Sequence, residues 1–209
     1  MIQEELKDFL DEKVLQYNTL DFIDSDPVQI PHRFSAKEDI EIAGFLAATI
    51  AWGNRKMIIN NANKMMQLMG NSPYDFVMNF SENHLKNLGG FVHRTFNSED
   101  LKFFMQSLRN IYQNHGGLEQ VFAKHQTSDS MQASISNFKQ TFFEIEHPTR
   151  TTKHISDPLN NSAAKRINMY LRWMIRDDKQ GVDLGIWKSI PTSILSCPCL
   201  LYTSPSPRD

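Results

Sequence analysis

The residues best suited to chemistry lie in one stretch near the end of the chain, from Ser162 to Arg176. On a helix of about 100° per residue, Lys165, Arg172 and Arg176 fall within about 20° of one line. The apolar side chains fall on the opposite face, and they are Ile167, Tyr170, Leu171 and Met174. Lysine amines serve proteins as nucleophiles and arginines bind phosphates, although such a stripe is also the ordinary solvated face of an amphipathic helix.

The charge of the chain is uneven. The net charge is −2, yet His147 to Arg176 carries six Lys or Arg residues and one acid, Asp157. This stretch therefore has a local charge of +5, and the rest of the chain has −7. A local cationic patch in a mildly acidic protein is compatible with phosphate contacts and equally with an unoccupied surface.

The same stretch carries a resemblance. The pattern Lys165-Arg166-x-Asn168-x-Tyr170-Leu171-Arg172 resembles the helix that bears the catalytic lysine in archaeal-type 8-oxoguanine DNA glycosylases, of the helix-hairpin-helix superfamily. More closely, the whole chain resembles DUF2400, a family of bacterial proteins of unknown function. The phrases that carry this second resemblance are Asp26-Pro27-x-x-Ile30-Pro31-His32, Asp39-x-Glu41-Ile42-Ala43-Gly44-Phe45, Trp52-Gly53-Asn54-Arg55, and Lys165 to Arg176.

The glycosylase resemblance implies an all-α, helix-hairpin-helix glycosylase-like helical domain, truncated at the C-terminus. It implies that Lys165 is the catalytic nucleophile and that the partner is damaged DNA. In that chemistry the amine attacks the sugar C1′ of an extruded nucleotide, the base leaves, and the Schiff base can lose the 3′ phosphate by β-elimination. We expect no cofactor and no metal.

Further residues are expected to contact nucleic acid. By position in the pattern, Asn54 and Arg55 lie in a turn near the extruded nucleotide; their alternative roles are a helix cap and a surface cation. The remaining candidates are Lys153, His154, Arg166, Arg172 and Arg176. The connector over residues 147–161 stands where glycosylases have a glycine-containing hairpin, but it has no glycine. Either that hairpin is remodelled or this surface does not bind DNA, because glycine best allows the backbone to approach a phosphate.

The last eleven residues, 199–209, match one reading frame of a transposase sequencing adapter residue for residue, and we interpret them as an artefactual tail. The alternative is a native Pro/Ser-rich tail. With the first interpretation the native sequence stops at about Pro198, just before the aspartate that the resemblance places next. We then expect an inactive fragment of the full-length protein.

Residues 1–198 suffice for one truncated helical domain. It divides into an N-terminal helix and connector (1–34), a helical lobe (35–146), and a second connector with the Lys165 helix (147–198). No apolar run reaches membrane-spanning length and no signal pattern opens the chain, so we expect a cytoplasmic protein with no membrane partner. Cys197, the single native cysteine, leaves no disulfide framework, zinc site or four-cysteine cluster.

Hydrophobic periodicity predicts the principal helices. The most apolar segment, Asp39 to Trp52, should be the buried central helix, opened by a capping box from Ser35 to Glu38. Ser162 or Asn161 should cap the Lys165 helix. The other predicted helices cover residues 2–17, 56–69, 73–80, 81–88, 100–112, 118–124 and 130–143. His32, beside Pro31, is expected to make a structural hydrogen bond.

Three functions fit these observations. The first is a DNA glycosylase or lyase that uses Lys165. The second is a non-catalytic helical module that binds nucleic acid or protein; the acidic net charge and the glycine-free connector favour it. The third is a plain all-α domain in which Lys165, Arg172 and Arg176 form ion pairs with acids elsewhere in the chain.

Overall fold

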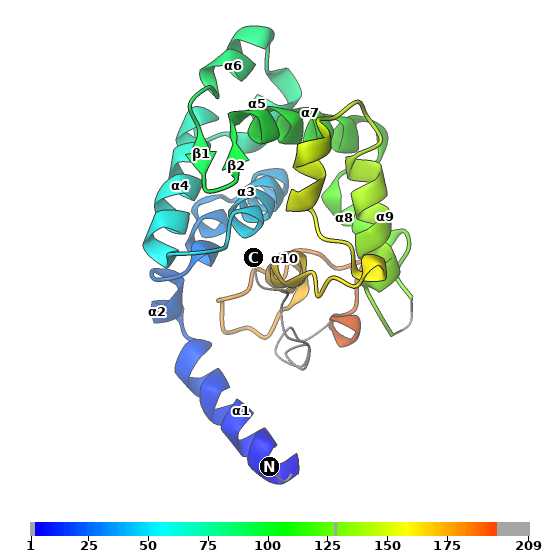
Figure 1. Ribbon diagram of the computed structural model, residues 1–209. Coiled ribbons are helices and arrows are strands. Elements are labelled where there is room, and N and C mark those ends of the chain that lie inside the picture. Colours follow the sequence, from blue (N-terminus) through cyan, green and yellow to red (C-terminus); the bar gives the residue numbers. More distant parts are fainter. Residues whose placement is uncertain (1–2, 128, 196–209) are drawn as a thin grey trace.

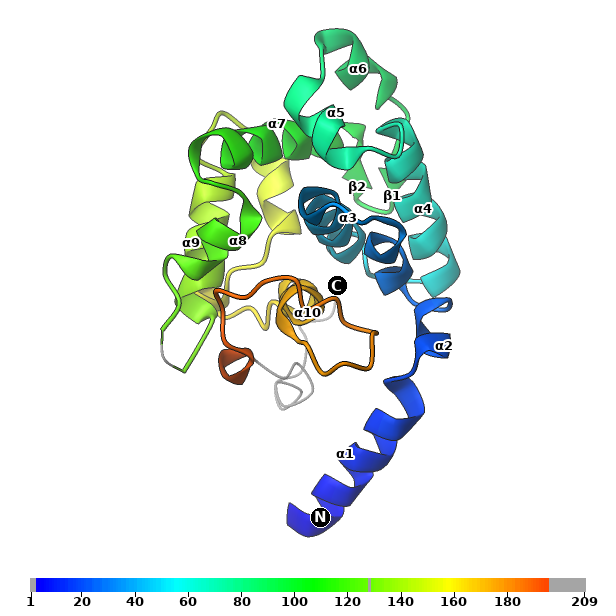
Figure 2. The same ribbon diagram turned by 180° about the vertical axis from the view of Figure 1, so that it is seen from behind.

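A computed structural model describes residues 3–127 and 129–195, and in this part of the chain the protein is built from helices arranged around α3 (Lys37–Thr49) (Figures 1 and 2). Ile40 to Thr49 are all buried, as the apolar sequence predicts. The Phe45 ring packs against the rings of Phe104, Phe138, Phe142 and Tyr170, at centroid distances of 5.5–5.8 Å. The all-α prediction is therefore confirmed, whereas the helix-hairpin-helix arrangement stays a prediction.

The other helices lie outside α3, and all but α1 form a shell around it. They are α1 (Gln3–Tyr17), α2 (Leu20–Ile23), α4 (Arg55–Leu68), α5 (Pro73–Asn79), α6 (Glu82–Asn87), α7 (Ser98–Asn114), α8 (Leu118–Ala123), α9 (Gln132–Phe142) and α10 (Lys165–Ile175). Short 3-10 turns cover Pro27–Gln29, Pro31–Arg33, Thr149–His154, Pro158–Asn160 and Thr192–Ile194. In Figure 1, α1 projects away from the body of the molecule.

The helix that carries Lys165 packs directly on the central helix. Gly44 of α3 makes this possible, because a Cβ atom there would lie 3.0 Å from Met174 Cε and 3.3 Å from the Tyr170 ring. On its other side α10 is covered by the segment that follows it, whose Leu184 and Trp187 amides donate to the carbonyls of Trp173 and Met174, both at 2.8 Å. The predicted apolar face of α10 is thus buried from two directions.

A short hairpin lies between residues 88 and 100, where the sequence analysis predicts no helix. Strands β1 (Val92–His93) and β2 (Phe96–Asn97) pair antiparallel, with Val92 opposite Asn97 and His93 opposite Phe96. The turn residue Arg94 has φ 54°. Two-residue strands are too short to produce a recognisable alternation of apolar and polar residues, so periodicity could not reveal them.

Two predicted helix caps are wrong. Helix α3 begins at Lys37 behind Ala36, so the capping box from Ser35 to Glu38 does not form. Helix α10 begins behind Ala164, which has φ 43° and makes no side-chain cap. The Ser162 hydroxyl instead accepts from the Ala164 amide at 3.2 Å, one residue before the helix starts. Serine readily makes this local bond two residues ahead, and here it competes with capping.

No helix in residues 3–127 and 129–195 is long and apolar enough to cross a membrane. The cytoplasmic location stays a prediction. Cys197, the proposed end of the native sequence at Pro198 and the proposed artefactual tail (199–209) lie outside the described residues.

Candidate nucleic-acid interface

Trp52 lies at the centre of the surface that the sequence motifs bring together. It follows the end of α3 and is half-buried, and the Arg166 guanidinium lies over its ring at 4.6 Å from the centroid. Arg166 also donates to the backbone carbonyl of Thr49, and to that of His154 at 3.4 Å. Burial lowers the pKa of Arg166. Arg166 therefore joins the start of α10 to the end of α3 and to the connector.

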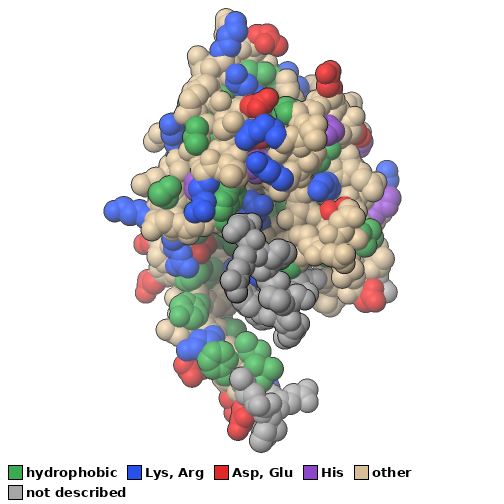
Figure 3. Space-filling model, viewed as in Figure 1, with side chains coloured by type: hydrophobic (Ala, Val, Ile, Leu, Met, Phe, Trp, Pro, Cys, Tyr) green, Lys and Arg blue, Asp and Glu red, His purple; other side chains and the backbone are tan. Residues whose placement is uncertain are grey.

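Two further basic residues adjoin Trp52 and Arg166, one through Gly53 and one along the chain. Arg94, at the tip of the hairpin, packs against Gly53, where a Cβ atom would lie 2.8 Å from the Arg94 guanidinium. Gly53 has φ 102°, which favours glycine and lets Arg94 approach. Lys165 is exposed and is the first residue of α10, next to Arg166. We call Trp52, Gly53, Arg94, Lys165 and Arg166 the Trp52 face; Figure 3 shows Lys and Arg side chains gathered where Figure 1 places the hairpin and α3.

His93 supports the Trp52 ring from beneath this face. Its ring meets that of Trp52 edge-on at 5.0 Å, and it is 1% exposed. The Asn61 amide lies 2.9 Å from His93 Nδ1, and Nε2 lies 3.3 Å from the Trp52 carbonyl. These partners assign the tautomer with the proton on Nε2. Burial lowers the pKa of His93, so it packs as a neutral ring.

His154, a predicted DNA contact, lies behind the surface and not on it. It is 4% exposed and stacks near Trp52 at 6.2 Å. Its Nε2 lies 3.2 Å from Asp100 Oδ2, in an orientation that does not form a hydrogen bond. Burial lowers the pKa of His154 and outweighs the opposite effect of Asp100. Lys153, its neighbour, is exposed.

A buried carboxylate that the sequence analysis missed fixes the connector. Asp100 is fully buried and accepts from Arg150 and from the Thr151 hydroxyl, both at 2.7 Å. Arg150 also donates to the Thr95 carbonyl in the hairpin turn. The pattern Asn97-x-x-Asp100, which forms the capping box of α7, was the available sequence signal. The connector is held by side chains, and this arrangement needs no glycine.

The predicted cationic line on α10 is largely neutralised. Arg172 and Arg176 each lie 3.2 Å from an oxygen of Asp183, which is 6% exposed, and Arg176 also pairs with Asp178 at 2.6 Å. Burial raises the pKa of Asp183 in spite of both arginines. Two of the three residues in the stripe thus hold the following segment against the helix, which is the role that the third hypothesis gave them.

Asn54 and Arg55 have the alternative roles considered for them. The Asn54 side chain caps α4 by accepting from the Met57 amide at 3.1 Å. Arg55 is exposed and lies over the Phe22 ring at 6.0 Å. Burial raises the pKa of Asp26, and Arg55 and Arg172 partly oppose that rise. Arg55 therefore lies near Asp26 and α2, and Asn54 links that region to the Trp52 face.

The backbone just before Lys165 is strained. Ala164 has φ 43° and is 2% exposed, and a non-glycine residue in this left-handed region costs roughly 1–2 kcal/mol. Such strain tends to persist where it positions a functional group.

His32 makes the structural hydrogen bond that was predicted for it, since its Nε2 lies 2.8 Å from the carbonyl oxygen of Val182. Within the described residues no group of three or more His, Cys, Asp or Glu side chains could hold a metal ion.

Comparison with known proteins places this chain in a family. The family model described as "Protein of unknown function (DUF2400)" matches residues 26–204, well over half of the chain. The chain belongs to the DUF2400 family. In this DUF2400 protein the matched region includes the whole Trp52 face and excludes α1. A search of curated proteins and a search of solved structures each returned no match. The likeness to glycosylases and the adapter origin of residues 199–209 therefore stay predictions.

Proposed function

We propose that this DUF2400 protein binds DNA through the Trp52 face and that Lys165 is the amine nucleophile of a base-excision reaction there. One observation carries the proposal. An exposed lysine follows a strained, buried alanine, and it stands beside an arginine whose guanidinium lies on a half-buried tryptophan. The Trp52 face thus combines a lysine amine, an arginine and an aromatic ring, which are the groups that the proposed reaction needs.

The Trp52 face offers the two contacts that nucleic acid uses most. An aromatic ring can stack with a nucleobase, a contact worth about 1–3 kcal/mol per base. The exposed cations Arg94 and Lys165 can contact phosphates. Arg166 lies over the Trp52 ring and donates to the carbonyls of Thr49 and His154, so the ring is positioned before a DNA strand binds.

The proposed chemistry needs one amine and the sugar of a damaged or abasic nucleotide. The Lys165 nitrogen bonds to C1′, and the base departs with the electron pair of the glycosidic bond; the C1′–O4′ bond then breaks as a proton passes from the nitrogen to O4′, which opens the sugar to a Schiff base. At an abasic site the amine adds to the C1′ aldehyde, whose oxygen departs as water. The resulting Schiff base acidifies C2′, and loss of that proton expels the 3′ phosphate. Sodium borohydride adds hydride to the same Schiff base and leaves a stable secondary amine.

Borohydride trapping on an oligonucleotide with one abasic site tests the proposal. We expect a covalent adduct with the full-length protein, and at least a tenfold smaller yield with its Lys165→Ala variant. Lys86→Ala is the matched control, since Lys86 is an exposed lysine on α6, outside the Trp52 face. An adduct of equal yield in Lys165→Ala would assign the reaction to another lysine and reject the catalytic role.

A second candidate function is a non-catalytic helical module that binds nucleic acid or protein, and the glycine-free connector and the acidic net charge favour it. The pairing of Arg172 and Arg176 with Asp183 lowers the positive charge that this helix offers to DNA phosphates. This function predicts DNA binding that weakens steeply with salt, in both wild type and Lys165→Ala, with no trapped adduct.

A further inference from the structure

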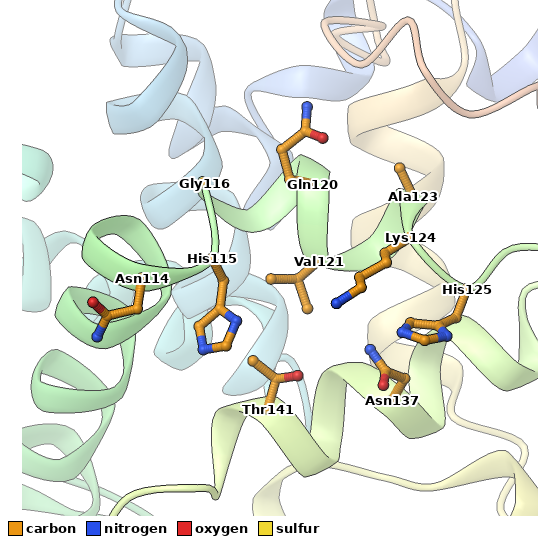
Figure 4. A pocket seen from close by; sticks show the side chains of 10 residues that line it. All are labelled: Asn114, His115, Gly116, Gln120, Val121, Ala123, Lys124, His125, Asn137 and Thr141. Atoms are coloured by element: carbon orange, nitrogen blue, oxygen red, sulfur yellow. The ribbon is translucent and has the colours of Figure 1, made fainter.

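A hollow of about 650 Å³ lies at the end of α7, between α8 and α9, and it is separate from the Trp52 face. Its polar lining includes His115, Lys124, His125, Asn137 and Thr141. Figure 4 shows the Lys124 ammonium, the His115 ring and the Asn137 and Thr141 side chains turned toward a common space, whereas Gln120 points away. Its size falls in the range of about 300–1,000 Å³ that is typical of small-molecule sites.

The lining is basic. None of the residues that line this hollow in the described part of the chain is Asp or Glu. The carboxylate beside it, Glu144, accepts from His115 Nε2 at 2.6 Å and from the Asn110 amide. Burial alone would raise the pKa of Glu144, but these two hydrogen bonds outweigh it and hold the pKa below its usual range. Glu144 is thus ionised and already hydrogen-bonded to Asn110 and His115, and it fixes the orientation of the His115 ring.

The two glycines between α7 and α8 create this arrangement. Gly116 and Gly117 have φ of 76° and 95°, and side chains rarely adopt such values. They reverse the chain directly after His115 and start the helix that brings Lys124 back to face it. At Gly117 a Cβ atom would also lie 3.1 Å from the Tyr112 ring. This glycine pair is the break between helices that the sequence shows at residues 116–117.

We propose that this hollow binds the phosphate monoester of a small molecule. A phosphate group presents several acceptor oxygens, and the lining supplies donors from different sides: the Lys124 ammonium, the Asn137 amide and the Thr141 hydroxyl. Lysine is an established binder of phosphate through its concentrated charge. The concave shape leaves room for a small organic group beside the phosphate. This site does not depend on the proposed function of Lys165.

Calorimetric titration with glycerol 3-phosphate tests the site, with inorganic phosphate in a second titration and ionic strength held constant. We expect saturable, one-to-one binding, at least tenfold weaker in Lys124→Ala and weakened in Thr141→Val. Lys86→Ala should bind as the wild type does, since its lysine lies on α6. Unfolding curves of Lys124→Ala should match the wild type, because Lys124 is exposed.

Three outcomes would overturn the assignment. The first is the absence of saturable binding to either phosphate compound. The second is equal affinity in Lys124→Ala and Lys86→Ala, which would mean general attraction of anions to the surface. The third comes from a further titration with citrate at the same ionic strength. Tighter binding of citrate than of glycerol 3-phosphate would make the hollow a carboxylate site. Lys165→Ala should leave the titration unchanged, so this test and the borohydride test fail independently.

Discussion

The Arg166 guanidinium lies over the Trp52 ring at 4.6 Å while it donates to the carbonyl of Thr49. Residues more than a hundred positions apart thus meet at one point, where the central helix ends and α10 begins. The contacts of Arg166 with Trp52 and Thr49, which hold these helices together, are also the centre of the candidate interface. Substitutions here should change both stability and binding, so each needs a control that separates the two.

Arg166→Ala should destabilise the fold. The substitution removes hydrogen bonds from a charged group, each worth about 1.5–3 kcal/mol, and a cation–π contact of about 0.5–2 kcal/mol. Because Arg166 is only half-buried, we expect a total loss of about 2–3 kcal/mol in the free energy of unfolding by urea. The exposed control Lys86→Ala should stay within about 0.5 kcal/mol of the wild type. Equal urea midpoints for Arg166→Ala and Lys86→Ala would show that the contacts of Arg166 contribute little to the stability of the fold.

Acid should weaken the fold through His93. Burial is the main cause that lowers its pKa, and Arg94 and Arg166 act in the same direction. Below the unfolded value of 6.5 the unfolded chain binds the proton more readily, so stability falls as the pH drops from 7 toward 5. One such group changes the free energy of unfolding by at most about 1.4 kcal/mol per pH unit.

His93→Gln isolates this effect from the other titrating groups. Glutamine can keep a bond to Asn61 but cannot take up a proton. We expect the wild type to lose more unfolding free energy than His93→Gln between pH 7 and pH 5. Parallel pH profiles for the two proteins would contradict the role of His93.

How far the sequence predicts the fold depends on how local the signal is. The central helix was evident, because the apolar residues from Ile40 to Ala51 leave almost no polar face. The start of α10 was not evident, because Ser162 can either cap a helix or accept from the amide two residues ahead, as it does here. Each strand of the hairpin is two residues long, a single period of alternation, which is too short to be recognised as a pattern.

In the candidate site, too, local sequence predicts some features and not others. The helical phase of Lys165, Arg172 and Arg176 follows from spacing alone and agrees with a helix that starts at Lys165. Their partners do not follow from spacing. Asp183 reaches Arg172 only because the chain turns back after α10, and that path is set by contacts such as the bond from Trp187 Nε1 to Glu41. Tertiary packing therefore decides which acids Arg172 and Arg176 meet.

Glu41 should affect stability in a pH-dependent way. It is 2% exposed and accepts from the Tyr112 hydroxyl at 2.6 Å and from Trp187 Nε1 at 2.7 Å. Glu41→Ala would leave both buried donors without this acceptor, at a cost of about 1–3 kcal/mol each. Glu41→Gln keeps an acceptor for one donor, so its loss should be much smaller.

The pH dependence separates these variants further. Burial raises the pKa of Glu41 above the unfolded value of 4.5, although both hydrogen bonds oppose the rise. The wild type therefore loses stability as the pH rises through the folded pKa, whereas Glu41→Gln does not titrate there. The stability of Glu41→Gln relative to the wild type should increase between pH 4 and pH 7, as measured by urea unfolding. A constant difference would show that Glu41 has the same pKa in both states.

Asp183→Asn should strengthen DNA binding by releasing Arg172 fully and Arg176 in part, because Arg176 keeps its ion pair with Asp178. Each arginine that gains a phosphate contact should steepen the plot of log affinity against log salt by about 0.9. The fold should lose less than the about 3–5 kcal/mol typical of a fully buried pair, since the two arginine side chains are 42% and 29% exposed. Asp177→Asn, which breaks the exposed pair with Lys188, is the control. An unchanged salt slope would mean that these arginines lie outside the DNA interface.

Trp52 should report DNA binding by its own fluorescence. The chain has three tryptophans; Trp173 and Trp187 are at most 1% exposed, so acrylamide should quench mainly the emission of Trp52. Addition of single-stranded DNA should reduce this quenching in the wild type, and Trp52→Phe should show little quenching with or without DNA. Trp52→Ala should bind about 1–3 kcal/mol more weakly, the contribution of one stacked base. DNA that binds without protecting Trp52 from acrylamide would place the interface on another face of the molecule.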